Sequence, residues 1–125
     1  MDNDVILYLP WPPTINEYYG VTKRGQRFLK KRATDYRKQV AECLHEQCPA
    51  LHLDEHLFME VYLAPPDNRK RDLDNYMKGL LDALTEGKLW ADDSLVDQLH
   101  IYRCATEARG KVRIELSEAG PVLTA

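Results

Sequence analysis

The side chains best suited to chemistry stand close together in one stretch of the chain. Asp72 and Asp74 occupy alternate positions, Lys78 follows Asp74 by one helical turn, and Asp92 and Asp93 come about one helix later. Carboxylate oxygens are the ligands that Mg²⁺ prefers in proteins, and the ion keeps open positions for water and for a phosphate oxygen. The spacing is therefore typical of a site for metal-assisted hydrolysis of a phosphodiester.

Cations directly upstream fit the same chemistry. Arg69, Lys70 and Arg71 precede the aspartates, and a run of cations attracts the phosphates of a nucleic acid. A purely structural interpretation also stands, in which the aspartates only cap a helix and form an ordinary surface pair with the following lysine. A calcium-binding EF-hand loop is excluded, because Met77 stands where that loop requires glycine and Ala83 where it requires a bidentate acid.

The segment after the aspartates has the apolar spacing of a helix. Its apolar stripe consists of Met77, Leu80, Leu81 and Leu84. The stripe predicts an amphipathic helix from Asp74 to Glu86, with Asp72 or Asp74 as its N-cap and Gly87 as its stop. The N-terminus of a helix favours phosphate oxygens, so this element supports the same site.

Asp93 reaches the other two aspartates only under a geometric condition. The predicted helix is roughly 20 Å long, whereas the segment from Gly87 to Asp93 spans at most about 20 Å when extended. Asp93 therefore meets Asp72 and Asp74 only by a nearly straight return of the chain. Otherwise it acts in the partner subunit of a dimer or lies outside the site, and the sequence leaves these outcomes open.

Charge is strongly segregated along the chain. The net charge is −3, but the segment from Lys23 to Lys38 carries eight cations against Asp35 alone, which leaves −10 for the remainder. A phosphate backbone responds to local potential, so this segment predicts a DNA contact. A solvated surface without a partner is the alternative. The candidate DNA-binding residues here are Lys23, Arg24, Arg27, Lys30, Lys31 and Arg32.

A series of motifs runs from about Leu9 to Asp97: Leu9-Pro10-Trp11-Pro12-Pro13-Thr14, Asn16, Tyr18-Tyr19, Arg71-Asp72-Leu73-Asp74-Asn75, Lys78, Asp82-Ala83-Leu84-Thr85, Trp90 and Asp92-Asp93. In their order and spacing these motifs resemble those of the RusA-type Holliday junction resolvases. By position, the resemblance implies that Asp72, Asp74 and Asp93 bind Mg²⁺ and that Lys78 assists catalysis. Asn75 and Asp92 match the pattern, but the resemblance assigns them no role.

The resemblance also implies an activity. This is an Mg²⁺-dependent endodeoxyribonuclease that resolves four-way DNA junctions by paired symmetric nicks in recombination and repair, acting as a homodimer. A four-way junction is itself two-fold symmetric, which suits a two-fold dimer with one site for each nick. Two alternatives remain: an Mg²⁺-dependent nuclease for other branched DNA, and a junction-binding protein that does not cleave.

The periodicity of apolar residues and the positions of glycine and proline predict an α+β fold. In this fold a small mixed sheet of about four strands packs against two main helices, in the order β-α-β-α-β-β. Two further features are a basic hairpin or loop around Gly25 and a stiff segment from Pro10 to Pro13 in which Trp11 plugs the core. The last two strands are expected to pair as an antiparallel hairpin with its turn at Ala108-Arg109-Gly110. Strands are predicted at residues 5–9, 57–64, 96–105 and 111–117, and the first helix is predicted at residues 31–47.

Composition places few further limits on the protein. A chain of 125 residues with 44% hydrophobic and 30% charged residues is expected to form one domain, 1–125, with a RusA-like endonuclease fold. It has no apolar run long enough for a membrane and no leader with a cleavage site. Its three cysteines are an odd number that fits a reducing compartment, so we expect a cytoplasmic protein.

Overall fold

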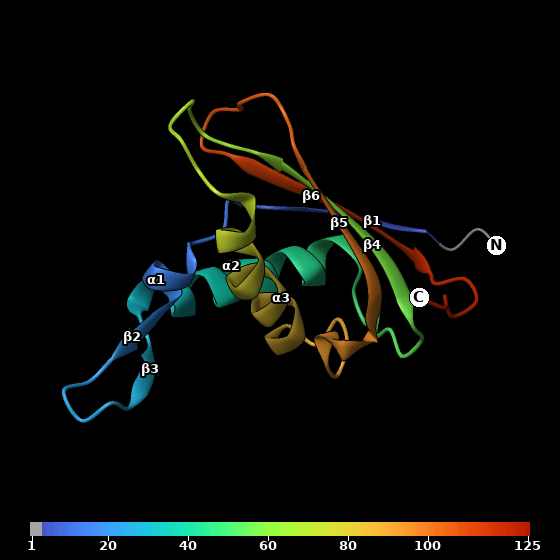
Figure 1. Cartoon of the computed structure of the whole chain (residues 1–125), viewed down its shortest axis with the longest axis horizontal. Helices are drawn as coiled ribbons and strands as arrows, with labels where there is room; N and C mark the ends of the chain where they lie inside the picture. The colour runs from blue at the N-terminus through green and yellow to red at the C-terminus, as the bar shows by residue number, and fades with distance from the viewer. Residues whose placement is uncertain (1–3) are drawn as a thin grey trace.

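The computed structural model describes residues 4–125 and has a mixed sheet with helices on one side of it (Figure 1). The strand order is β1-β6-β4-β5, and a separate two-stranded hairpin projects from the body. The arrangement confirms the predicted α+β fold. The elements are β1 (Val5–Leu9), α1 (Ile15–Tyr18), β2 (Tyr19–Val21), β3 (Arg27–Leu29), α2 (Lys31–Gln47), β4 (Leu57–Ala64), the 3₁₀ turn η1 (Leu73–Tyr76), α3 (Met77–Glu86), the 3₁₀ turn η2 (Asp93–Leu95), β5 (Val96–Arg103) and β6 (Lys111–Glu118).

The core lies between the sheet and helices α2 and α3. Strands β4 and β6 alternate buried and half-buried residues, so that one face of each strand packs against the helices. Helix α2 has the predicted bounds and buries a stripe at helical spacing. No helix within residues 4–125 combines the length and apolar character needed to cross a membrane. The buried hydrophobic residues of these four elements are Leu57, Met59, Val61, Leu63, Val112, Ile114, Leu116, Ala33, Tyr36, Val40, Leu44, Met77, Leu80, Ala83 and Leu84.

The predicted hairpin between the last two strands is wrong. Strand β6 lies between β1 and β4 and pairs antiparallel with both, whereas β5 pairs with β4 in parallel at the edge of the sheet. The reason is burial. The apolar side chains of β6 are fully buried, while none in β5 is, so the more apolar strand takes the central position. The turn at Ala108-Arg109-Gly110 suggested that β5 and β6 pair with each other, but burial in the core decides the strand order.

The entry to α3 also differs from the prediction. The chain forms the 3₁₀ turn η1 first, and the α-helix begins at Met77 instead of Asp74. Asp72 occupies the N-cap position of η1 but makes no side-chain capping bond. Gly87 follows the last helical residue, as predicted. The two aspartates are therefore not held by the helix end that the sequence indicated, which leaves their carboxylates available for other partners.

Candidate active site

The aspartate segment lies where β4 delivers the chain to α3. Asp72 precedes η1, Asp74 lies within it, and Lys78 lies in the first turn of α3. All three side chains are exposed. Within residues 4–125 no hydrogen bond or ion pair engages the side chains of Asp72, Asp74 or Lys78, although Lys78 follows Asp74 at i+4. The structure thus brings these three predicted residues to one end of α3 and leaves them unpaired.

The loop before the aspartates is organised by Asp67. Its carboxylate lies 2.8 Å from the Arg71 guanidinium and 3.2 Å from that of Arg69, and it accepts a 3.0 Å bond from the Arg69 backbone N–H. These bonds, with Arg71 contributing most, hold the pKa of Asp67 well below its usual range. Arg71 is only 12% exposed. The cations that remain open to solvent in this loop are therefore Arg69 and Lys70.

Aromatic packing fixes the other side of this loop. The rings of Trp11 and Tyr76 lie 4.8 Å apart, and the Arg71 guanidinium stands 5.8 Å above Trp11. Trp11 packs against the core, as predicted. A side chain at Gly110 would come within 2.8 Å of Trp11, and φ there is +72°, so glycine suits this position on both counts. Arg103 at the end of β5 donates a 2.9 Å bond to the Arg71 carbonyl.

Asp93 lies at the other end of α3. Trp90, before it, is held by a 2.7 Å bond from its indole N–H to Thr85 and by a bridge to Leu53, so the chain does not return along the helix. Asp93 opens η2, directly before β5. The eight residues of β5 separate its two ends by more than about 20 Å. Asp93 lies before the first end, whereas Arg103 at the second end contacts Arg71. Within residues 4–125, no group of three or more metal-ligating side chains gathers in one chain.

The other predicted DNA-binding residues lie on the projecting hairpin and on the start of α2 (Figure 1). Gly25 at the hairpin tip has φ +83°, a conformation that glycine adopts without strain. Arg27 stacks on the Tyr19 ring at 3.8 Å, which holds one cation of the hairpin in place. Lys23, Arg24, Arg27, Lys30, Lys31 and Arg32 are all exposed. The basic surface thus extends well beyond the aspartate segment.

The sequence did not reveal one polar network. Tyr18 is fully buried; its hydroxyl donates to Asp82, and Arg37 binds the same carboxylate at 2.7 Å. Arg37 also lies 3.5 Å from Glu86, so the network joins α1, α2 and α3. Burial raises the pKa of Tyr18, and its bond to Asp82 raises it further. The i+4 spacing of Asp82 and Glu86 was the signal available, but their partner lies on another helix.

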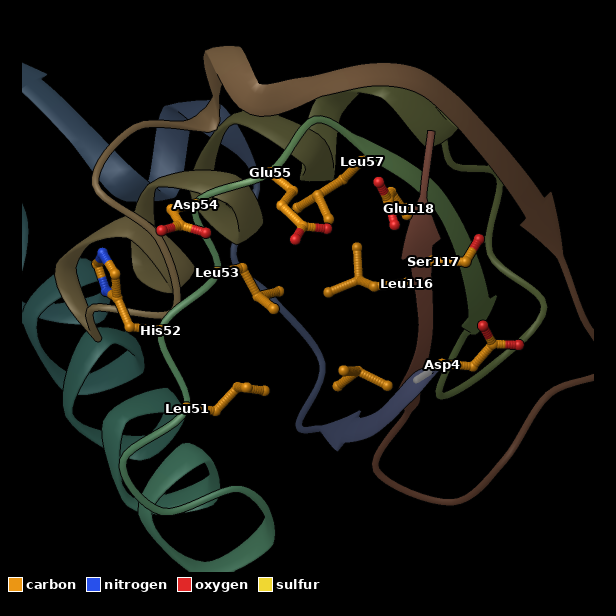
Figure 2. Close-up of a pocket in the computed structure, with 11 residues that line it drawn as sticks. Asp4, Leu51, His52, Leu53, Asp54, Glu55, Leu57, Leu116, Ser117 and Glu118 are labelled. Atoms are coloured by element: carbon orange, nitrogen blue, oxygen red, sulfur yellow. The ribbon is translucent and has the colours of Figure 1, made fainter. Parts of the chain in front are cut away.

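A hollow of about 770 Å³ is lined by residues outside the aspartate segment (Figure 2). Leucines such as Leu51 and Leu53 form part of its wall, and acidic side chains such as Glu55 and Glu118 lie around it. Acidic groups repel phosphate, so this hollow is unsuited to a nucleic acid backbone. The candidate site is instead the open surface at the start of α3.

Comparisons with known proteins assign the chain to a family. The family model described as "Endodeoxyribonuclease RusA" matches residues 10–117. "Crossover junction endodeoxyribonuclease RusA" from Escherichia coli strain K12 is 30% identical over 118 residues, which cover 94% of this chain and 98% of that protein. The protein of the same name from Enterobacteria phage HK97 is 32% identical over 117 residues, covering 93% and 96%. These matches confirm the resemblance seen in the motifs, and the chain belongs to the RusA endodeoxyribonuclease family.

Proposed function

We propose that this protein is an Mg²⁺-dependent endodeoxyribonuclease that resolves four-way DNA junctions by paired symmetric nicks in recombination and repair. The observation that carries the proposal is the pair of exposed, unpaired aspartates at the start of α3 in a chain of the RusA family. Its relatives are named crossover junction endodeoxyribonucleases. The chain would act as one endonuclease domain, 1–125.

The donor set fits Mg²⁺. Asp72 and Asp74 supply hard oxygen ligands, and neither is engaged by a cation within residues 4–125, unlike Asp67 and Asp82. Asp72, Asp74 and Asp93 would hold the ion. When bound, Mg²⁺ supplies Lewis-acid polarisation of the scissile phosphate and acidifies an attacking water. An acid that is already bonded to arginine could not serve in the same way without losing that partner.

Lys78 would act on the charge that develops during cleavage. Its ammonium group is exposed and stands one turn after Asp74. A positioned cation stabilises negative charge that grows on the phosphate and on the leaving oxygen. Lys78 is available for this role because no acidic side chain pairs with it within residues 4–125.

A homodimer would complete the site. One chain does not bring Asp93 to Asp72 and Asp74, because β5 and α3 both separate them. Asp93 of one subunit would therefore serve the aspartates of the other. Two such composite sites related by a two-fold axis match the two-fold symmetry of a four-way junction, with one nick made at each site.

Several exposed cations would bind the DNA. Arg69 and Lys70 stand beside the aspartates and would bring a strand to the site. The cations of the projecting hairpin and of the start of α2 would contact the arms of the junction, each through phosphates. Arg71 would support the loop through Asp67 more than contact DNA directly.

Cleavage of a labelled mobile four-way junction tests the activity. With Mg²⁺, the wild-type protein should make paired symmetric nicks, and Asp72→Asn should bind the junction with similar affinity but not cleave it. Flapped DNA and linear duplex at the same salt concentration serve as matched substrates. Tight junction binding without nicks by the wild type would refute the nuclease, and equal cleavage of flaps would refute the junction preference.

Mixed dimers test the composite site. Asp72→Asn and Asp93→Asn are each expected to be inactive, but a mixed dimer would contain one site with both native aspartates. Exchange of subunits between the two variants should therefore restore cleavage, limited to one nick per binding event. If all aspartates of a site came from one chain, every site in the mixture would lack one carboxylate and the activity would stay absent.

A further inference from the structure

The hairpin formed by β2 and β3 carries an exposed aromatic side chain without a stacking partner. Phe28 on β3 is 46% exposed. Other exposed rings are covered on one side, since Lys111 lies 4.7 Å over Tyr8 and Tyr102 stacks on Tyr62 at 5.0 Å. Within residues 4–125 neither a ring nor a cation stacks on Phe28. A single exposed apolar residue is common on protein surfaces, so its surroundings must decide whether it has a function.

Strand β2 holds the Phe28 ring in one place. Gly20 is the residue directly opposite Phe28 in the hairpin. A Cβ at Gly20 would lie 2.8 Å from Cε1 of the ring and 2.9 Å from Cε2, so the ring occupies the space that a side chain at residue 20 would fill. One part of the ring is therefore fixed against the strand, and the remainder stays open to solvent.

The hairpin itself is held at its tip and at its base (Figure 1). At the tip, the Thr22 N–H donates a 2.8 Å bond to the Gln26 carbonyl, and the Gly25 N–H donates a 2.9 Å bond to the Thr22 carbonyl. At the base, the Lys30 N–H donates a 3.0 Å bond to the carbonyl of Tyr18, which is fully buried. A group that is fixed before binding loses little conformational entropy when its ligand arrives.

The surroundings of Phe28 are basic. Residues 19–34 contain six cations and no acid. A ligand suited to this hairpin carries negative charge and also offers a flat apolar face. A nucleic acid offers both where its bases are unstacked, because every base has a π-face and an aromatic side chain can cover it. Within a continuous duplex those faces are already covered by the neighbouring base pairs.

We propose that Phe28 stacks on a base at the branch point of a DNA junction and so distinguishes branched DNA from linear duplex. The inference rests on the proposed function, because it names the feature of the substrate that the protein recognises. The continuous stacking of each arm can end at the branch point, where a base face becomes available. Stacking tolerates any base, so Phe28 would select structure and not sequence. The neighbouring cations bind phosphates in any DNA and add affinity without this selection.

Binding of a four-way junction and of a linear duplex in EDTA tests the role of Phe28. Phe28→Ala should weaken junction binding about tenfold, the effect of losing one stacked base, and change duplex binding by less than about twofold. Phe28→Trp should keep the junction affinity because it keeps a π-face, whereas Phe28→Leu should bind like Phe28→Ala. Arg24→Ala should instead weaken binding to both DNAs and reduce the salt slope by about 1.

Val21→Ala is the matched control. Val21 is 68% exposed on the same hairpin, but it lies opposite Arg27 and so faces the other side from Phe28. This variant should bind both DNAs like the wild type, and circular dichroism checks the folding of every variant. Phe28→Leu, which keeps an apolar side chain over Gly20, serves if Phe28→Ala does not fold.

Three binding results would overturn the proposal. They are equal losses on junction and duplex in the Phe28 variants, full junction affinity in Phe28→Leu, and a wild type without preference for the junction. The first result would give Phe28 only a structural role or a general contact with DNA. The second would replace stacking with simple apolar contact.

Photocrosslinking locates the contact. The photoreactive base iodouracil, placed at the branch point, should crosslink to the peptide that contains Phe28. The same base placed in the middle of an arm should not crosslink to this peptide, and Phe28→Ala should abolish the crosslink. Absence of the crosslink at every branch-point position would also overturn the proposal.

These results separate the stacking contact from the activity. A wild type that crosslinks through Phe28 at the branch point but does not nick a junction with Mg²⁺ would refute the proposed nuclease alone. A wild type that nicks junctions, while Phe28→Ala binds junction and duplex as the wild type does, would refute the stacking contact alone.

Discussion

Helix α3 carries charged residues along one side at intervals of four, and its two halves use them differently. In the first half, Asp74 just before the helix and Lys78 in its first turn are exposed and unpaired within residues 4–125. In the second half, Asp82 binds Arg37 at 2.7 Å and accepts a bond from the Tyr18 hydroxyl. The same residue type thus faces solvent at one end of the helix and closes a helix contact at the other.

Packing explains the contrast. Helices α1 and α2 contact α3 around Asp82, which binds Tyr18 of α1 and Arg37 of α2. At the start of the helix Asp74 and Lys78 are exposed, and no side chain within residues 4–125 pairs with either. Carboxylates under a neighbouring helix need a cation partner because burial without one is costly, whereas exposed carboxylates can wait for an external ion. The comparison separates acids that hold the fold from acids available for chemistry.

The largest effect is expected from Asp74→Asn. Loss of a metal ligand should reduce junction cleavage by more than about 100-fold, the upper range for residues that only support such ligands. Stability should change by no more than about 0.5 kcal/mol, as for most surface substitutions. Single-turnover cleavage and urea unfolding measure the two quantities. A large loss of stability would show that Asp74 is one of the acids that hold the fold.

The same substitution at Asp82 should give the opposite result. Asp82→Asn removes the charge that pairs with Arg37 and accepts from Tyr18, and it should lower the free energy of unfolding by roughly 2 kcal/mol. Cleavage per folded molecule should stay close to the wild-type rate at a temperature well below the transition. Loss of cleavage in a fully folded Asp82→Asn protein would break the distinction between the two halves.

A smaller effect is expected from the cations before the aspartates, of which one is free and one is paired with an acid. Lys70 is exposed, so Lys70→Ala should weaken junction binding and reduce the salt slope of log K by about 1 without loss of stability. Arg71 is held by Asp67, so Arg71→Ala should lower stability as well. Binding titrations at several salt concentrations, with urea unfolding on the same samples, measure both. Identical behaviour of the two variants would contradict the assignment.

The smallest effect concerns the loss of folding stability at acidic pH. The pKa of Asp67 is lowered in the folded state, chiefly by Arg71, so this ion pair stabilises the fold above the unfolded pKa of about 4. The contribution is lost as the pH falls through the lower folded pKa. Urea midpoints below about pH 4 should therefore fall less steeply for Asp67→Asn than for the wild type. Arg71→Met should produce the same flattening, and an unchanged slope in both variants would refute the role of this pair.

Local pattern was sufficient for much of the fold. The bounds of α2 and β4 follow from helical spacing and from strict alternation, because each pattern matches the period of one element. The segment around Asp72 was predicted to lie at a strand-to-helix junction, and the structure has this segment between β4 and α3. The antiparallel pairing of β6 with β5 could not be excluded from sequence, since strand order depends on which strand the core buries most completely.

By itself, the sequence determined the main strands and helices, the family and the residues that can do chemistry, because these depend on residue type and spacing along the chain. Only the tertiary structure decided which charges are available. It pairs Asp82 with Arg37 of another helix, and it places Asp93 directly before the start of β5, away from Asp72. These outcomes depend on contacts between residues distant in the sequence, where burial and the direction of a strand select the partner.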